Sequence, residues 1–110
     1  MCFFRKKKRA AVQSNNDRDL ISGNERSIEA LLILAEGNEE LIGKLKSLRE
    51  KIKYLTPSED AKIYGYDKKI KDLIEDMRIA LVKADGETSK KVENCLQQIK
   101  LTIADRNAKA

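Results

Sequence analysis

The apolar residues of this chain recur at alternating steps of three and four from about residue 31 onward. That spacing places them on one side of an α-helix, in the pattern of helices that pack along a narrow stripe. The first run predicts a helix that begins near residues 22–24 and ends near residue 55. Its stripe positions are Leu31, Leu34, Asn38, Leu41, Leu45, Leu48, Ile52 and Leu55.

The segment 36–40 permits a second interpretation of this run. Gly37 suits a helix end, Asn38 suits the cap of a new helix, and two glutamates follow, which favour a helix N-terminus. We expect a continuous or kinked helix, because the apolar spacing is maintained across the segment. Asn38 would then point inward and could set the register of packing. A break at Gly37-Asn38 would instead give four helices in all.

The tetrapeptide Thr56-Pro57-Ser58-Glu59 separates the first run from the second. Thr at an N-cap, Pro in the first turn and Glu three residues after the cap are typical of a helix start. We therefore predict a second helix from Pro57 to about Ala84, folded back antiparallel onto the first. On its outer face Asp67 is expected to pair with Lys71. Its stripe positions are Ile63, Tyr66, Ile70, Leu73, Met77, Ala80 and Ala84.

A third helix is expected after Asp85-Gly86, where Gly86 suits the left-handed conformation that follows a helix end. It is predicted from Glu87 or Ser89 to Asn107. Three helices joined by short turns give an all-α, antiparallel up-down-up three-helix bundle with coiled-coil-like packing, in a domain that spans residues 24–110. The stripe positions of the third helix are Val92, Cys95 or Leu96, Ile99, Thr102 or Ile103, and Arg106.

The composition agrees with one small helical domain. A chain of 110 residues with 5% aromatic residues, one proline and five glycines lacks the strand and turn residues of a typical sheet protein. The charge is uneven, because residues 1–27 hold seven Lys or Arg and three Asp or Glu, which is four of the five net positive charges. The rest of the chain is therefore near neutral, which disfavours nucleic-acid binding by the helices themselves.

Residues 1–23 are predicted to form a flexible basic tail, since the segment 13–19 is polar and without periodicity. Such a tail can be a solubilising end, or it can bind an anionic membrane, where each basic residue contributes about 1 kcal/mol. Contact with a nucleic acid is the weaker interpretation, because the fold offers no aromatic platform for base stacking. The candidate membrane or polyanion contact residues are Phe3, Phe4, Arg5, Lys6, Lys7, Lys8 and Arg9.

No pattern in the chain indicates catalytic chemistry, a metal site or a cofactor. The sequence has no His, and its two cysteines, Cys2 and Cys95, are far apart. We expect Cys95 to be a partly apolar residue of the third helix rather than a reactive thiol. Tyr54, Tyr64 and Tyr66 are expected to pack around the junction of the first two helices, with their hydroxyl groups in solvent.

These observations predict a protein that is not an enzyme. The function that fits them best is a helical protein-protein interaction or adaptor module, with self-association as one form of it. The alternative is a peripheral membrane protein held by its basic-apolar N-terminus. The longest apolar run, at residues 30–35, is too short to span a bilayer, and the N-terminus lacks the pattern of a secretory signal. We therefore expect a cytoplasmic protein, with a place at the inner membrane face as the alternative.

Overall fold

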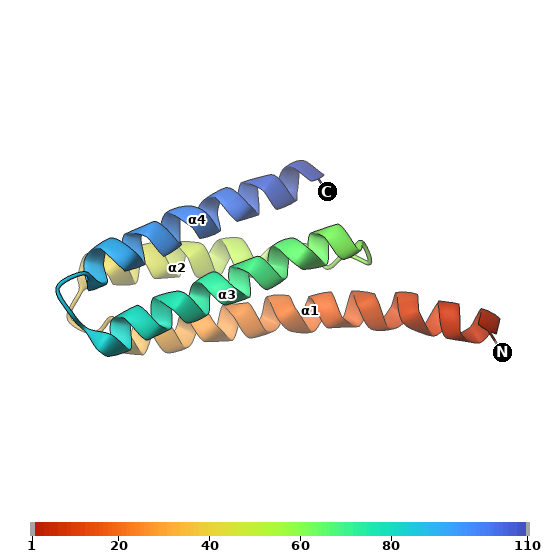
Figure 1. Cartoon of the computed structure of the whole chain (residues 1–110), viewed down its shortest axis with the longest axis horizontal. Coiled ribbons are helices and arrows are strands. Elements are labelled where there is room, and N and C mark those ends of the chain that lie inside the picture. The colour runs from red at the N-terminus through yellow and green to blue at the C-terminus, as the bar shows by residue number, and fades with distance from the viewer. Residues whose placement is uncertain (1, 110) are drawn as a thin grey trace.

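The computed structural model describes the backbone of residues 2–109 and the side chains of residues 16–109. Within that range the chain forms four helices and no strand: α1 (Cys2–Leu34), α2 (Glu39–Lys53), α3 (Ala61–Lys83) and α4 (Thr88–Lys109). Figure 1 shows them side by side in one elongated bundle. The prediction of an all-α bundle is confirmed. The prediction of three helices is wrong, and the four-helix alternative is the observed one.

The chain breaks between α1 and α2 because Gly37 and Asn38 provide local alternatives to helix. Gly37 has φ +90°, a left-handed conformation that glycine adopts without strain. The side-chain oxygen of Asn38 then accepts a hydrogen bond from the Leu41 amide at 3.1 Å and caps α2. The expectation of a continuous helix is therefore wrong. The apolar spacing survives the break because both helices face the same core, although Leu34 itself is 45% exposed.

The helices pack in an order that differs from their order in the sequence. Helix α1 packs against both α2 and α3, and α3 packs against α4, whereas α2 and α3 are not a closely packed pair among the described residues. The predicted hairpin of neighbouring helices across residues 54–60 is therefore wrong. Figure 1 shows that α1 and α3 run in one direction and α2 and α4 in the other. The link 54–60 crosses the end of the bundle, so that α1 and α3 are parallel neighbours.

Helix α3 begins later than the Thr56-Pro57-Ser58-Glu59 motif predicts. Its N-cap is Asp60, whose side chain accepts a hydrogen bond from the Lys62 amide at 2.8 Å. The Ser58 hydroxyl in turn accepts from the Asp60 amide at 3.0 Å. Thr56 lies four residues before this N-cap and does not cap the helix, and its carbonyl oxygen accepts a hydrogen bond from Arg106 of α4. A turn closed by the Ser58 side chain and a turn closed by the Asp60 side chain thus replace the expected capping box.

Helix α1 begins earlier than predicted, at Cys2 rather than near residues 22–24. Its buried positions are Asp17, Ile21, Asn24, Ile28 and Leu31, which alternate by steps of four and three, and Ala35 continues the spacing just after the helix. Two of these positions are polar, which concealed the helical spacing in the sequence. The predicted boundary between a tail and a bundle at residue 23 thus falls inside α1, and Asp17 and Ile21 already belong to the bundle. Figure 1 shows the first part of α1 extending past the other three helices.

The turn between α3 and α4 uses a residue other than the predicted one. Ala84, with φ +48°, adopts the left-handed conformation expected of Gly86. Its amide still bonds to the carbonyl of Ala80, so the end of α3 is closed. Helix α4 starts at Thr88, between the two predicted starts, and runs to Lys109. The core between the helices contains Ile28, Leu31, Leu45, Leu48, Ile52, Ile70, Met77 and Ile99 among its most deeply buried residues.

Candidate functional site

A cluster of polar side chains is buried where α1, α3, α4 and the link 54–60 meet. Its members, each at most 2% exposed, are Asp17 and Asn24 of α1, Asp67 of α3, and Thr102 and Arg106 of α4. Charged residues are almost never fully buried unless they are paired, so the cluster must satisfy its own charges and hydrogen bonds. The contacts of its members satisfy most, but not all, of these charges and hydrogen bonds.

Arg106 is the central residue of the cluster. Its Nε donates to Oδ1 of Asp67 at 2.8 Å, and its Nη2 donates to the carbonyl oxygen of Thr56 at 2.7 Å. The same Nη2 lies 3.5 Å from Oδ2 of Asp17. The guanidinium group therefore joins α4 to α3, to the link 54–60 and to α1. The planar fork of donors in arginine suits this role better than the single ammonium of a lysine.

The two carboxyl groups have further contacts that tie the cluster to the backbone. Oδ2 of Asp17 accepts a hydrogen bond from the Ser58 amide at 2.7 Å. Asn24 donates through Nδ2 to the backbone carbonyl of Asp67 at 3.1 Å. Thr102 donates to the Gln98 carbonyl one turn earlier in α4, which satisfies its hydroxyl group locally. The link 54–60 is thus held by α1 and α4 from both sides.

The electrostatics of the cluster are unbalanced. Two buried carboxyl groups face a single guanidinium, and one oxygen of each, Oδ1 of Asp17 and Oδ2 of Asp67, has no hydrogen-bond partner. Burial, followed by the neighbouring Asp17 carboxyl group, raises the pKa of Asp67 to about 7, although Arg106 acts in the opposite direction. Among the described residues this is the one place where buried charges do not cancel in number.

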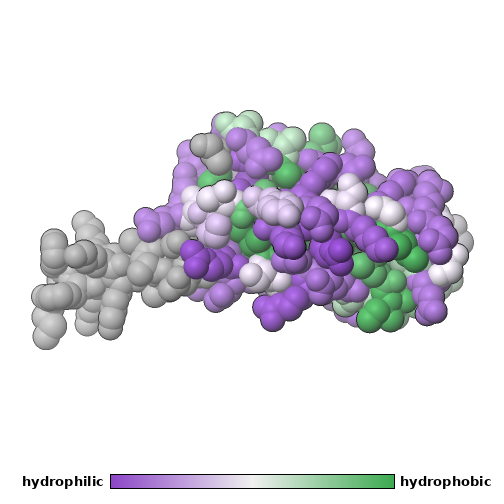
Figure 2. Space-filling model, turned by 180° about the vertical axis from the view of Figure 1, so that it is seen from behind, coloured by the Kyte–Doolittle hydropathy of each residue, from purple (hydrophilic) through white to green (hydrophobic). Residues whose placement is uncertain are grey.

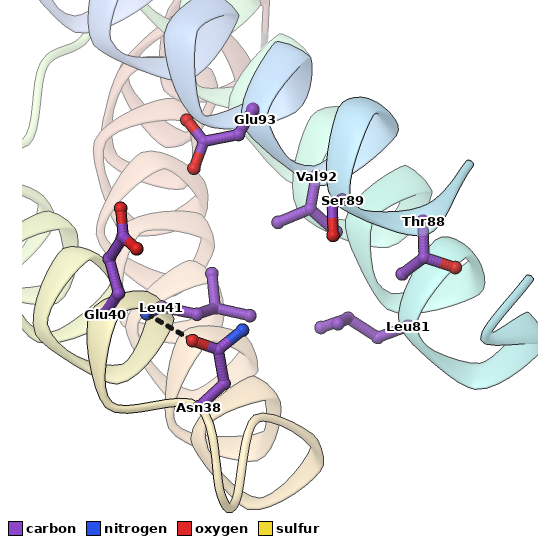
Figure 3. A pocket seen from close by; sticks show the side chains of 8 residues that line it. All are labelled: Asn38, Glu40, Leu41, Leu81, Thr88, Ser89, Val92 and Glu93. Atoms are coloured by element: carbon purple, nitrogen blue, oxygen red, sulfur yellow. Dashed lines mark hydrogen bonds between the residues drawn. The ribbon is translucent and has the colours of Figure 1, made fainter. Parts of the chain in front are cut away.

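A small hollow lies at the opposite end of the bundle, between the N-terminal turns of α2 and α4 (Figure 3). It has a volume of about 190 Å³, and Asn38, Leu41, Leu81 and Val92 are among the residues that line it. On its rim, Glu40 and Glu93 both bind Lys44 of α2, at 3.3 and 2.5 Å from its Nζ. Glu93 and then Glu40 raise the pKa of Lys44. Both rim glutamates thus pair with the same lysine, which leaves one net negative charge on the rim.

Four large apolar side chains are exposed on the last turns of α1 and α3. They are Ile33 at 74%, Val82 at 60%, Leu34 at 45% and Ile79 at 44%. Because α1 and α3 are parallel neighbours, these turns lie at the same end of the bundle. Figure 2 shows apolar side chains gathered at the right-hand end of that view, where α1 and α3 terminate. We call Ile33, Leu34, Ile79 and Val82 the apolar end.

The residues singled out from the sequence lie apart from these features. Phe3, Phe4 and the five basic residues 5–9 belong to the backbone of α1, and their side chains lie outside the described residues. Cys95 is half-buried, and burial, followed by the charge of Asp76, raises the pKa of its thiol, as expected for an unreactive cysteine. Tyr54 is exposed at the end of α2, with Lys53 above its ring.

Sequence reasoning missed three members of the buried cluster. Asp67 was expected on the outer face with Lys71, but its side chain is fully buried. Asp17 and Asn24 were assigned to or near the tail. The signal that could have found them is the continued four-three spacing upstream of Ile28, at positions 24, 21 and 17. Arg106 was placed on the stripe of the last helix, and the structure confirms that position.

No helix in the described part of the chain is both long enough and apolar enough to cross a bilayer. No group of three or more His, Cys, Asp or Glu side chains is placed there to hold a metal ion. Comparisons with protein-family models, with curated proteins and with solved structures found no match to this chain.

Proposed function

We propose that this protein is a non-catalytic helical interaction module that binds a partner protein through the apolar end. The observation that carries this proposal is the exposure of Ile33, Leu34, Ile79 and Val82 on adjacent helix ends. Single exposed apolar residues are normal on a protein surface, but a group of large ones on neighbouring elements is typical of an interaction site. A partner with an apolar surface of its own would bury these side chains.

The other surface features support a binding role more than a chemical one. The hollow between α2 and α4 is small, and its rim charges pair with one another. The buried cluster around Arg106 is closed from solvent by the helices that it joins. The apolar end offers four large apolar side chains that binding would remove from water.

A photo-crosslinking experiment in the source cells tests this function. A photoreactive amino acid replaces Ile33 in one variant and Lys46, an exposed residue of α2, in a control. The expected result is a discrete crosslinked protein from position 33 that position 46 does not give. Identical patterns from the two positions would argue against the apolar end as the binding surface.

The purified partner then allows a quantitative test. The double variant Ile33→Glu, Val82→Glu should weaken binding by roughly tenfold or more, since central interface residues each contribute about 1–2 kcal/mol or more. Leu101→Glu, on the half-exposed face of α4, is the matched control and should bind as the unaltered protein does. Sedimentation velocity of the unaltered protein, from micromolar to millimolar concentration, shows whether a second copy is the partner.

The basic N-terminus favours a second candidate function, reversible attachment to an anionic membrane. The run of five basic residues at 5–9 accounts for the net positive charge of the chain, and α1 is helical from Cys2. The run and the bundle are thus joined by continuous helix rather than by a flexible linker. Binding of a nucleic acid by the same segment is the weaker proposal.

A further inference from the structure

We propose that Asp17 and Asp67 share one proton in the folded bundle. This proton holds the middle of α1 against α3 and α4, and its loss as the pH rises weakens that contact. We call the shared proton the latch. The inference rests on the buried cluster and is independent of the partner of the apolar end. It concerns three side chains from three helices: Asp17, Asp67 and Arg106.

The first argument is the charge balance of the cluster. With both carboxyl groups ionised, two negative charges and one positive charge would lie in the interior, at exposures of 2% or less. An excess buried charge is costly, because the protein interior solvates it poorly. One proton on the carboxyl pair makes the cluster neutral without moving any atom.

The second argument is the pair of unsatisfied oxygens. Oδ1 of Asp17 and Oδ2 of Asp67 are both buried and both lack a donor. A carboxylate only accepts hydrogen bonds, whereas a protonated carboxyl also donates one. A proton on one carboxyl would therefore satisfy both oxygens at once, by a hydrogen bond from one group to the other. Such shared protons are the usual solution where two carboxyl groups occupy one site.

Two charged side chains act on the Asp67 carboxyl group. Asp17 faces it from α1 and Arg106 from α4, while the link 54–60 contributes only the neutral Thr56 carbonyl and Ser58 amide. The balance of burial, Asp17 and Arg106 brings the pKa of Asp67 to about 7. The proton would thus be exchanged near neutral pH, and its occupancy would respond to modest changes of pH.

The geometry also indicates which helix the latch releases. Arg106 binds Asp67 at 2.8 Å but lies 3.5 Å from Asp17, so α3 and α4 remain joined when the proton leaves. Asp17 then faces an ionised Asp67, and only the Ser58 amide and the longer contact to Arg106 compensate its charge. A hollow of about 350 Å³ between α1 and α3, lined by Asn24, Leu20 and Tyr64, brings solvent next to the cluster. Deprotonation therefore favours opening of α1 around residues 17–24.

Hydrogen exchange of backbone amides, corrected for intrinsic rates, measures that opening. With one proton lost on opening, the opening constant of residues 17–24 should rise about tenfold from pH 5 to pH 6 and only about twofold from pH 7 to pH 8. Asp17→Asn removes one negative charge and keeps the shape of the side chain, so its opening should be nearly independent of pH. Asp72→Asn, an exposed substitution on α3, is the matched control and should follow the unaltered protein.

A titration of the unaltered protein by carbon-13 NMR of the Asp side-chain carboxyl carbons provides a test that needs no variant. The expected result is a step near pH 7 at the resonance of Asp67. Two outcomes would overturn the proposal: titration of Asp67 below pH 5, or the same pH profile of opening in the protein with and without Asp17→Asn.

Discussion

At the scale of single residues, Arg106 joins the segments that meet at the end of the bundle where the link 54–60 lies. Its guanidinium group contacts α1, α3 and the link 54–60 at once, while its own backbone belongs to the last turns of α4. A hydrophobic residue at this position would pack against the neighbouring helices but would leave two buried carboxyl groups without their cation. Arg106 thus fixes the positions of α1, α3 and the link 54–60 relative to α4, in addition to any stability that it contributes.

The substitution Arg106→Leu should lower the free energy of unfolding by about 3–5 kcal/mol, because it leaves Asp67 and Asp17 buried without a cation. Arg78→Leu, which removes an exposed arginine of the α3 surface, should change it by less than about 1 kcal/mol. Urea denaturation at neutral pH, followed by circular dichroism, measures both. A loss of similar size in the two variants would show that the buried cluster does not stabilise the fold.

At the scale of elements, the separate existence of α2 depends on local capping. Asn38 accepts a hydrogen bond from the Leu41 amide, Glu39 and Glu40 occupy the first turn, and Lys51 and Lys53 occupy the last. Each of these charges complements the helix dipole. Helix α2 has 15 residues and buries four of them, so its termini matter more than those of the longer helices.

Removal of the cap by Asn38→Ala should cost about 1 kcal/mol of stability, whereas Asn38→Asp should retain most of it. Asn94→Ala, at an exposed position of α4, serves as the control and should have little effect. Thermal unfolding by calorimetry measures the differences. If Asn38→Ala unfolds at the same temperature as Asn94→Ala, the cap is not what separates α1 from α2.

The N-terminal part of α1 is the element to which the membrane hypothesis applies. Removal of residues 1–9 should abolish binding to vesicles that contain anionic lipid, since the five basic residues would contribute about 1 kcal/mol each. Vesicle co-sedimentation at low and high salt measures this, and zwitterionic vesicles are the control. Equal binding by the full and shortened chains would contradict the hypothesis. A parallel gel-shift panel with DNA and RNA tests the polyanion interpretation.

At the scale of the whole molecule, the parallel arrangement of α1 and α3 has the largest consequences. It brings Ile33 and Leu34 to the same end as Ile79 and Val82, which forms the apolar end. At the other end it brings Asp17 to Asp67, so that α4 can bind both through Arg106. The elongated bundle, 56 Å in its longest dimension, therefore has a polar cluster inside one end and an exposed apolar surface at the other.

Distances between paired spin labels test this arrangement. In a protein with Cys2 and Cys95 replaced by serine, a label at Glu36 should lie closer to one at Lys83 than to one at Lys62. The two separations should differ by roughly 20–30 Å, because α3 rises about 1.5 Å per residue between the two positions. The opposite order of distances would mean that α1 and α3 are antiparallel. Enzymatic or binding activity is not needed for this measurement.

The amino-acid sequence alone determines that this protein is helical and where most of its helices lie. The spacing of Leu41, Leu45, Leu48 and Ile52, the cap at Asn38 and the turn at Asp85-Gly86 are local signals, readable without knowing any neighbour. Even the break at Gly37 is present in the sequence as one of two interpretations. We expected one helix because the apolar spacing is maintained across the break. That expectation failed because two helices that face the same core maintain the same spacing.

Only the tertiary structure decided which helices are neighbours and what the polar stripe positions do. Whether Asp67 faces solvent or the interior depends on the helices packed beside it, because a carboxyl group can be buried only where a cation such as Arg106 arrives from elsewhere in the chain. For the same reason Asp17 was assigned to the tail, and Asn24 was expected only at the start of a helix. The burial of a polar residue is indicated in the sequence only by its place in the apolar spacing, whereas an apolar residue also indicates burial by its own side chain.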